Sequence, residues 1–210
     1  MKKKKDIDVT QIYDFICRSG SDHLPTFGGT FEGGINAQQV PMELASCLAT
    51  ILESGKKIES FLEIGAAAGG TTFLVDHFLK PKNIVLIDDN RHPKAHVRPY
   101  ILRDVKRQEI IGDSQHSNTV DQVEKLDLSF DLLLIDGDHS FPGVKKDFDN
   151  YFPIVKVGGF ILFHDSALIN FGVYPFVNGL KLDDRCNFIG EFINDSFPRC
   201  GLALFEKVEK

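Results

Sequence analysis

Residues 60–72 read Ser-Phe-Leu-Glu-Ile-Gly-Ala-Ala-Ala-Gly-Gly-Thr-Thr, and this stretch decides the fold. Its first five residues form a short, mainly apolar run, typical of a strand that is buried on both faces. The glycines that follow let the backbone approach a ligand closely, and the threonines begin a helix whose free N–H groups face that ligand. The stretch predicts a strand, a ligand-binding loop and a helix, although a plain strand-to-helix turn also fits it.

Short apolar runs alternate with helical segments over the rest of the chain, which is typical of a parallel sheet covered on both faces. The predicted strands lie at 60–64, 83–87, 109–111, 130–135, 159–163, 187–193 and 202–208. The predicted helices among them lie near 70–80, 93–105, 117–125, 142–155 and 171–181. A short connection between the last two strands, through residues 196–198, permits a hairpin. We therefore expect an α/β fold with a Rossmann-like, seven-stranded, mostly parallel sheet, an antiparallel last strand and helices on both faces.

Two more helices are predicted before the first strand. Apolar residues recur at helical spacing over residues 7–18, and Pro41 opens a second helix that Gly55 closes. Between them lies a glycine-rich segment, residues 27–34, which could act as a lid. We expect an N-terminal helical extension with this lid over residues 1–56 and the main domain over 57–210, together forming one globular unit.

Composition restricts the class of protein. A net charge of −6, with positive charge concentrated only at Lys2–Lys5, argues against a nucleic-acid surface. That lysine run is either a tether to an anionic surface or a solvated terminus. No run reaches the roughly 18 apolar residues that cross a bilayer, and the four cysteines are far apart without a CxxC pair. We expect a soluble, cytoplasmic protein without membrane or nucleic-acid partners. Whether it forms a homo-oligomer is an open question at this point.

An acidic pair, Asp88-Asp89, ends the second predicted strand 23 residues after Gly65. An acidic side chain at this place can accept hydrogen bonds from both hydroxyls of an unphosphorylated ribose. The loop lacks the GxGxxG spelling of a pyrophosphate cradle, and Glu63 just before it would repel a pyrophosphate. The pattern favours a ligand with a cationic sulfonium and ammonium group.

Carboxylates and imidazoles follow the fourth and fifth predicted strands. The fourth strand ends in Asp136-Gly137-Asp138-His139 and the fifth in His164-Asp165, each after an apolar run. Such clustering is costly unless it is used. Because adjacent strands lie about 4.8 Å apart, Asp136 and Asp165 could share one small cation.

These motifs resemble those of the class I methyltransferases, over about residues 40–208. The resemblance is carried by Glu63-x-Gly65-x-x-x-Gly69, by Asp88 and by Gly112-Asp113-Ser114-Gln115. It implies S-adenosyl-L-methionine as cofactor, with the glycine loop around its methionine part, Asp88 on the ribose and the 112–115 segment near the adenine. For Asp113, an Asx turn leaving a strand is the alternative. The implied cofactor-binding residues are Glu63, Gly65, Ala66, Gly69, Thr71, Asp88, Asp113, Ser114 and Asp136.

The Ile-Asp-Gly-Asp-His-Ser segment and the later Phe-His-Asp resemble a subgroup of small-molecule O-methyltransferases. This group includes the family 24 methyltransferase domains, the cephalosporin hydroxylase-like proteins and the macrolide-sugar methyltransferases. The resemblance implies a divalent metal held by Asp136 and Asp165, with His139 as general base. With His164 beside them, the predicted metal ligands are Asp136, His164 and Asp165, and the predicted ion is Mg or Mn. The chain departs from the group at His164, usually acidic there, and an imidazole favours softer ions such as manganese, iron or zinc. Without a metal, the carboxylates would form a hydrogen-bonded cluster that orients the two histidines.

The sequence therefore predicts a methyltransferase that moves a methyl group to a hydroxyl of a small molecule such as a sugar, a polyketide or a phenolic metabolite. The implied catalytic residues are His139, Asp136 and His164, and the alternative for His139 is a helix-start residue bonded to Asp138. Two rival functions stay open. One is another reaction on the same fold, aminopropyl transfer or hydroxylation, and the other is a catalytically silent scaffold or regulator that binds the cofactor.

Overall fold

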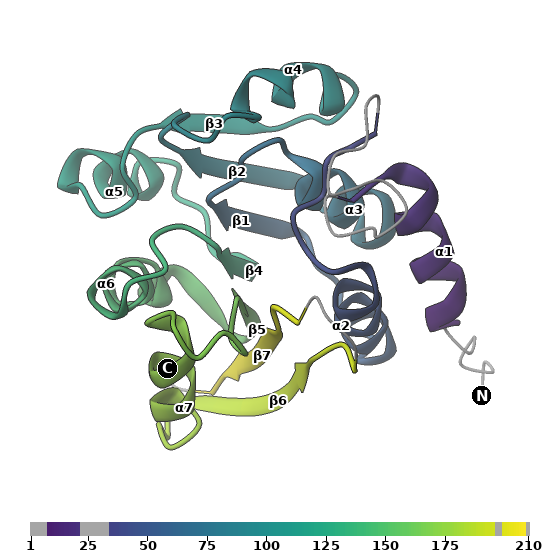
Figure 1. Ribbon diagram of the computed structural model, residues 1–210. Coiled ribbons are helices and arrows are strands. Elements are labelled where there is room, and N and C mark those ends of the chain that lie inside the picture. The colour runs from purple at the N-terminus through teal and green to yellow at the C-terminus, as the bar shows by residue number, and fades with distance from the viewer. Residues whose placement is uncertain (1–7, 22–33, 196–198, 209–210) are drawn as a thin grey trace.

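The computed structural model describes residues 8–21, 34–195 and 199–208. Seven strands form one sheet in the order β3-β2-β1-β4-β5-β7-β6 (Figure 1). All neighbouring strands are parallel except β7, which is antiparallel to both β5 and β6. The predicted sheet, with its antiparallel last strand, is confirmed. The strands are β1 Ser60–Ile64, β2 Asn83–Asp88, β3 Gln108–Ile111, β4 Phe130–Ile135, β5 Val155–His164, β6 Cys186–Phe192 and β7 Leu202–Lys207.

Helices cover both faces of the sheet (Figure 1). Successive residues of β1, such as Phe61 and Leu62, are buried in two separate apolar clusters because strand side chains alternate between faces. The cluster around Phe61 packs against α1, α2 and α3, and the cluster around Leu62 packs against α5, α6 and α7. The helices are α1 Val9–Ser19, α2 Pro41–Glu53, α3 Gly70–Leu79, α4 Arg98–Ile101, α5 Ser117–Glu124, α6 Phe141–Tyr151 and α7 Val173–Leu180.

The helix predicted over residues 93–105 is much shorter in the structure. A 3₁₀ turn at Ala95–Val97 leads into the single turn of α4. Pro99, which has no backbone N–H, cannot extend the hydrogen bonding of the preceding turn into one continuous helix. The prediction of a long helix here is therefore wrong.

The helix predicted over residues 142–155 ends four residues early. A 3₁₀ turn at Phe152–Ile154 follows α6, and Pro153 within it removes the donor that a continuing helix would need. The strand β5 then begins at Val155 instead of the predicted residue 159. The register of its pairing with β4 shifts between Phe130 and Leu132. The first residues of β5 therefore lack the regular apolar pattern by which the strand was predicted.

The N-terminal helices share the main hydrophobic core. Ile12 and Ile16 of α1 and Leu44 and Leu48 of α2 are buried in the cluster that also contains Phe61 of β1. The predicted division at residue 56 stays a prediction. The predicted lid, apart from Gly34, lies outside the described residues, as do Lys2–Lys5 and the 196–198 connection. Within the described ranges, no helix combines the length and apolar character that a membrane span requires.

The buried Lys207 of β7 should contribute strongly to stability. Its ammonium group donates to the carbonyls of Phe152 and Val155, both at 2.9 Å, and to that of Pro153 at 3.3 Å. We expect Lys207→Met to lower the free energy of unfolding by about 2–4 kcal/mol, because buried carbonyls lose a charged donor. Urea denaturation measures the change, and Lys145→Met, in an exposed pair with Asp149, should cost at most about 0.5 kcal/mol. Equal effects of the two substitutions would contradict this role.

Candidate active site

The carboxyl ends of β1 and β4 meet at very short range. Asp136 donates its backbone N–H to the carbonyl of Ile64 at 3.0 Å, and Gly65 donates to that of Ile87 at 2.9 Å. Gly65 has a φ of +85°, and a Cβ there would lie 2.0 Å from the carbonyl oxygen of Asp136. Only glycine fits this position, which brings the loop after β1 against the acidic end of β4.

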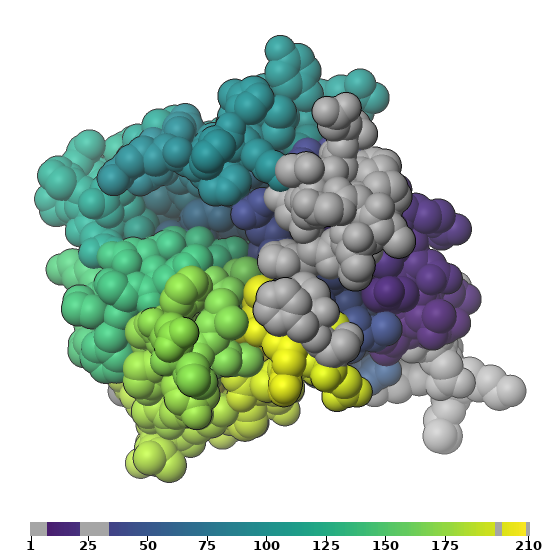
Figure 2. Space-filling view, viewed as in Figure 1, coloured from purple at the N-terminus to yellow at the C-terminus, as the bar shows by residue number. Residues whose placement is uncertain are grey.

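A cavity of about 760 Å³ opens at these strand ends. The molecular surface is recessed between the teal and the green segments of the chain (Figure 2). This volume falls in the range of small-molecule sites. The lining is built from the glycine loop, the ends of β1 to β5 and segments that flank them: Gln38, Gln39, Ile64, Gly65, Ala66, Ala67, Gly70, Thr71, Ile87, Asp88, Asp89, Arg91, His92, Gly112, Asp113, Ser114, Gln115, Asp136, Gly137, Asp138, His139, His164, Asp165, Leu168, Phe171 and Cys200.

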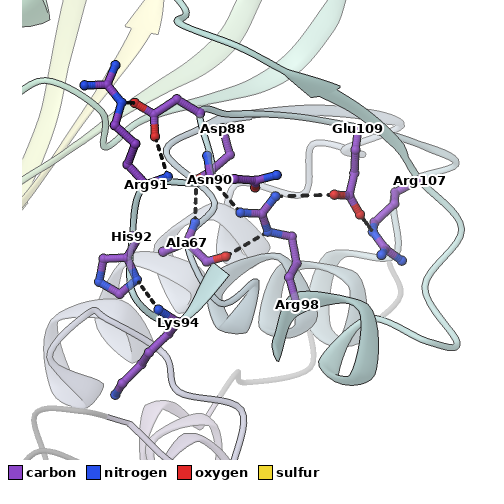
Figure 3. Close-up of polar contacts among 10 residues, drawn as sticks. Ala67, Asp88, Asn90, Arg91, His92, Lys94, Arg98, Arg107 and Glu109 are labelled. Carbon is purple, nitrogen blue, oxygen red and sulfur yellow. Dashed lines mark hydrogen bonds and ion pairs between the residues drawn. The ribbon is translucent and has the colours of Figure 1, made fainter. Parts of the chain in front are cut away.

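A buried arginine fixes the loop between β1 and α3 (Figure 3). Arg98 is 1% exposed, and its guanidinium lies 2.7 Å from Asp88 and donates to the carbonyl of Ala67, also at 2.7 Å. Asp88 in turn accepts the N–H of Ala67 at 2.8 Å, where the backbone has a positive φ of 43°. The acidic residue that ends β2 therefore holds the loop as well as facing the cavity. The exposed Asp89 lies beside it on the cavity lining.

Glu63 lies behind the loop and not on the cavity lining. It is 1% exposed and accepts a hydrogen bond from the hydroxyl of Thr72. Burial raises the pKa of Glu63 to about 8, so its carboxyl is mostly protonated at neutral pH. The charge predicted for Glu63 is therefore largely absent here, and the argument against a pyrophosphate rests on the loop sequence. Of the other predicted loop residues, Gly65, Ala66 and Thr71 line the cavity and Gly69 does not.

The segment after β3 borders the cavity, and its predicted place near an adenine stays a prediction. Asp113 accepts the N–H of Gln115 at 2.9 Å, which is the predicted Asx turn, and it also lines the cavity. Ser114 lines the cavity and donates its hydroxyl to Asp147 at 2.6 Å. Asp147 is fully buried, and burial raises its pKa to about 7. Sequence reasoning missed this carboxyl because it lies within α6, away from any strand end.

The four charged residues predicted at the ends of β4 and β5 come together. His139 lies 3.3 Å from Asp136 through Nε2 and 3.3 Å from Asp165 through Nδ1. His164 lies 3.0 Å from Asp136 and 3.6 Å from Asp165, both through Nδ1. The alternative in which His139 bonds to Asp138 is wrong, because its two ring nitrogens lie beside Asp136 and Asp165.

The charged groups of this cluster shift one another's pKa values. Burial alone lowers the pKa of His139 and His164, but the two carboxylates outweigh it, so the pKa of His139 is raised and that of His164 lies well above its usual value. Burial raises the pKa of Asp136, but the two imidazoles overcome this and bring it to about 2. Phe171 stacks on His139 with ring centroids 5.0 Å apart. The cluster therefore places each imidazole between two carboxylates, and Phe171 covers one face of the His139 ring.

Two cavity residues that the sequence did not single out complete the cluster. Gln39, which precedes α2, donates to Asp136 at 2.9 Å and accepts the hydroxyl proton of Thr71. Cys200, which precedes β7, lies on the lining beside His164 and Asp165. Neither belongs to a motif, but β7 begins where the antiparallel neighbour β5 ends, so residues just before it must face the site.

Two groups of side chains within the described ranges have the spacing of metal ligands. Ligand atoms of Asp136, His139 and Asp165 lie within 4.8 Å of one another, and so do those of His164, Asp165 and Cys200. The three predicted ligands, Asp136, His164 and Asp165, are spread over both groups. His92, His96 and His116 bond to neighbouring backbone groups, and His92 also lines the cavity.

A sequence profile of the Methyltransf_24 family, described as a methyltransferase domain, matches residues 62–166. This span is half of the chain and includes the glycine loop and the polar ends of β4 and β5. The chain belongs to this family. The predicted methyltransferase family and Rossmann-like fold are therefore confirmed.

Individual relatives are distant from this methyltransferase domain. Uncharacterized protein R132 of Acanthamoeba polyphaga mimivirus is 29% identical over 132 residues, 59% of this chain, and the match spans 60% of that protein's length. The O-methyltransferase TomG of Streptomyces achromogenes, involved in tomaymycin synthesis and solved with SAM, gives a TM-score of 0.64 at 16% identity, over 98% of this chain and 92% of TomG. MycE methyltransferase of the mycinamycin pathway, solved with Mg, SAH and mycinamycin VI, gives a TM-score of 0.51 at 21% identity. This match covers 71% of this chain and 45% of the MycE chain. At these identities the two structures establish a shared fold.

The buried Asp147 should make stability depend on pH. Its folded pKa of about 7 lies above the ordinary 3.8, so folding favours the protonated form and loses stability as pH rises through this range. We expect Asp147→Asn to raise the unfolding free energy at pH 8 by on the order of 2–4 kcal/mol and to change it little at pH 4. Thermal denaturation across pH measures this. The exposed Asp149→Asn is the control, and a stabilisation independent of pH would contradict the assignment.

Proposed function

We propose that this domain is an S-adenosylmethionine-dependent O-methyltransferase that acts on a hydroxyl group of a small molecule. The proposal rests on one cavity that connects the glycine loop and Asp88-Asp89 with the cluster of Asp136 and His139. A nucleotide-like ligand on the first side would place its reactive end toward the second. The family match supports a methyl transfer, and the cavity volume supports a small acceptor.

The residues of the cluster suit proton removal from an acceptor hydroxyl. S-adenosylmethionine supplies the methyl group, and the protein must align the acceptor and take its proton. His139 lines the cavity, and Asp136, which lies 3.3 Å from Nε2, fixes the ring and would stabilise the imidazolium that forms when Nδ1 accepts the proton. Gln39 and His164 hold Asp136 in place from two other directions. His139 is thus the proposed base, and Asp136 and His164 position it.

The donor atoms present also fit a divalent metal. Asp136, His164 and Asp165 would hold it, and a bound cation would lower the pKa of the acceptor hydroxyl. Nδ1 of His164 lies 3.0 Å from Asp136 and 3.6 Å from Asp165, so one imidazole nitrogen and both carboxylates lie close enough together to share an ion. The alternative is a hydrogen-bonded cluster in which the imidazoles alone balance the carboxylates. The magnesium in MycE supports the metal.

The proposed acceptor is a sugar, a polyketide or a phenolic metabolite. Leu168 and Phe171 give the cavity an apolar side next to His139, which suits the ring of such an acceptor. TomG and MycE belong to tomaymycin and mycinamycin synthesis, which supports a specialised metabolite. None of the four cysteines forms a disulfide, which supports the predicted cytoplasmic location.

Cofactor binding is the first test. We expect S-adenosylmethionine and S-adenosylhomocysteine to bind with micromolar affinity in isothermal titration, since the cavity and its loop are preformed. Decarboxylated S-adenosylmethionine should bind more weakly, whereas an aminopropyl transferase would prefer it. The proposal fails if neither form of the cofactor binds with or without added metal.

Catalysis by His139 is the second test. We expect His139→Ala to lower kcat by about 10²–10⁴-fold while cofactor affinity stays unchanged, because a general base acts on the acceptor and not on the cofactor. S-adenosylhomocysteine release, with a panel of sugars, catechols and polyketides as acceptors, measures the rate. The exposed His96→Ala is the matched control. A scaffold without catalytic activity would show no turnover for His139 to support, and an undiminished rate in the variant would exclude His139 as base.

A further inference from the structure

Cys200 lies where its thiol can reach the polar cluster. It is 8% exposed and lines the cavity. Its Sγ, one nitrogen of His164 and one carboxylate oxygen of Asp165 are all within 4.8 Å of one another. A tetrahedral zinc site, with Zn–N of about 2.0 Å and Zn–S of about 2.3 Å, places such atoms roughly 3.5 Å apart. Small rotations of these side chains would bring the three atoms to that spacing.

The backbone around Cys200 is fixed by a buried carboxylate. Glu43 of α2 is 1% exposed and accepts the N–H of Gly201 at 2.8 Å and that of Asn194 at 2.9 Å, and the N–H of Cys200 also faces it. The carbonyl of Cys200 accepts the N–H of Ala167 at 2.9 Å. The residue is therefore held from both sides against the segment that follows His164 and Asp165.

The two partners of Cys200 bring donor atoms of other kinds to the same place. Nε2 of His164, a side chain that is 6% exposed, has no partner at hydrogen-bond geometry among the described residues, and the Cys200 thiol is the neighbour of this imidazole within the group. Asp165, which is 5% exposed, contributes a carboxylate oxygen. A nitrogen, an oxygen and a fixed thiol thus converge on one end of the cavity.

We propose that Cys200 is a metal ligand and that His164, Asp165 and Cys200 together select a transition-metal ion such as zinc or iron over magnesium. Thiolate and imidazole are soft or borderline donors that favour these ions, whereas magnesium prefers oxygen ligands alone. Asp136 on the adjacent strand supplies further negative charge. This inference rests on the metal in the proposed function and changes its identity.

Cobalt titration of the full chain tests the ligand directly. Chelator-treated, reduced protein is titrated with Co²⁺, and the near-ultraviolet absorption of a cobalt–thiolate bond is recorded. We expect one equivalent of Co²⁺ to produce this band, Zn²⁺ to displace it and Mg²⁺ to leave it unchanged. Cys200→Ser should abolish the band and weaken Co²⁺ binding by at least about 10-fold. Cys17→Ser, at a partly exposed cysteine of α1, should retain both.

Three results would overturn the inference. Bound Co²⁺ without the thiolate band would show an ion held by other ligands, and a band that persists in Cys200→Ser would assign the thiolate elsewhere. Absence of Co²⁺ binding would exclude the metal itself. A parallel titration with S-adenosylmethionine, and circular dichroism of Cys200→Ser and Cys200→Ala, separate these results from loss of cofactor binding or of the fold. The methyltransferase proposal is therefore tested by cofactor titration and not by cobalt binding.

Discussion

The close contact between the ends of β1 and β4 is the constraint on which the rest of the site depends. The missing side chain of Gly65 allows its backbone to lie against the carbonyl of Asp136, and parallel pairing fixes the two strands in register. This contact places the loop that would hold a cofactor next to the carboxylate that would face an acceptor. Any side chain at residue 65 would separate the two halves of the cavity.

The polar cluster at this edge is balanced by its own members. Taken alone, Asp136 and Asp165 at the ends of apolar strands would be strongly unfavourable. His139 and His164 lie between them, so each carboxylate has an imidazole within 4 Å. The cluster is stable because imidazoles separate its carboxylates, and the same arrangement places an imidazole on the cavity lining.

The sequence predicted those parts of the molecule that follow from local pattern. Apolar runs predict the strands to within a few residues. Because parallel strands end at one edge of the sheet, the sequence also predicts that His139 and His164 lie close together. The helix after β2 was overestimated because Pro99 interrupts it. Arg98 and Cys200 were not predicted because their roles depend on tertiary packing, which brings Arg98 to Asp88 at the end of β2 and pairs β7 with β5. The predicted antiparallel direction of β7 is the one sequence signal that would have placed Cys200 at this edge of the sheet.

The bond between Glu43 and the loop before β7 has a consequence for how the site forms. Glu43 and Gly201 are 158 positions apart, and Gln39 and Asp136 are 97 apart. Contacts between such distant segments are slow to form because a large loop must close first. The strand ends can assemble from neighbouring units during synthesis, but this corner of the cavity needs α2 and β7 together. The side of the cavity formed by Gln39 and Cys200 therefore requires contacts between segments that are far apart in the chain.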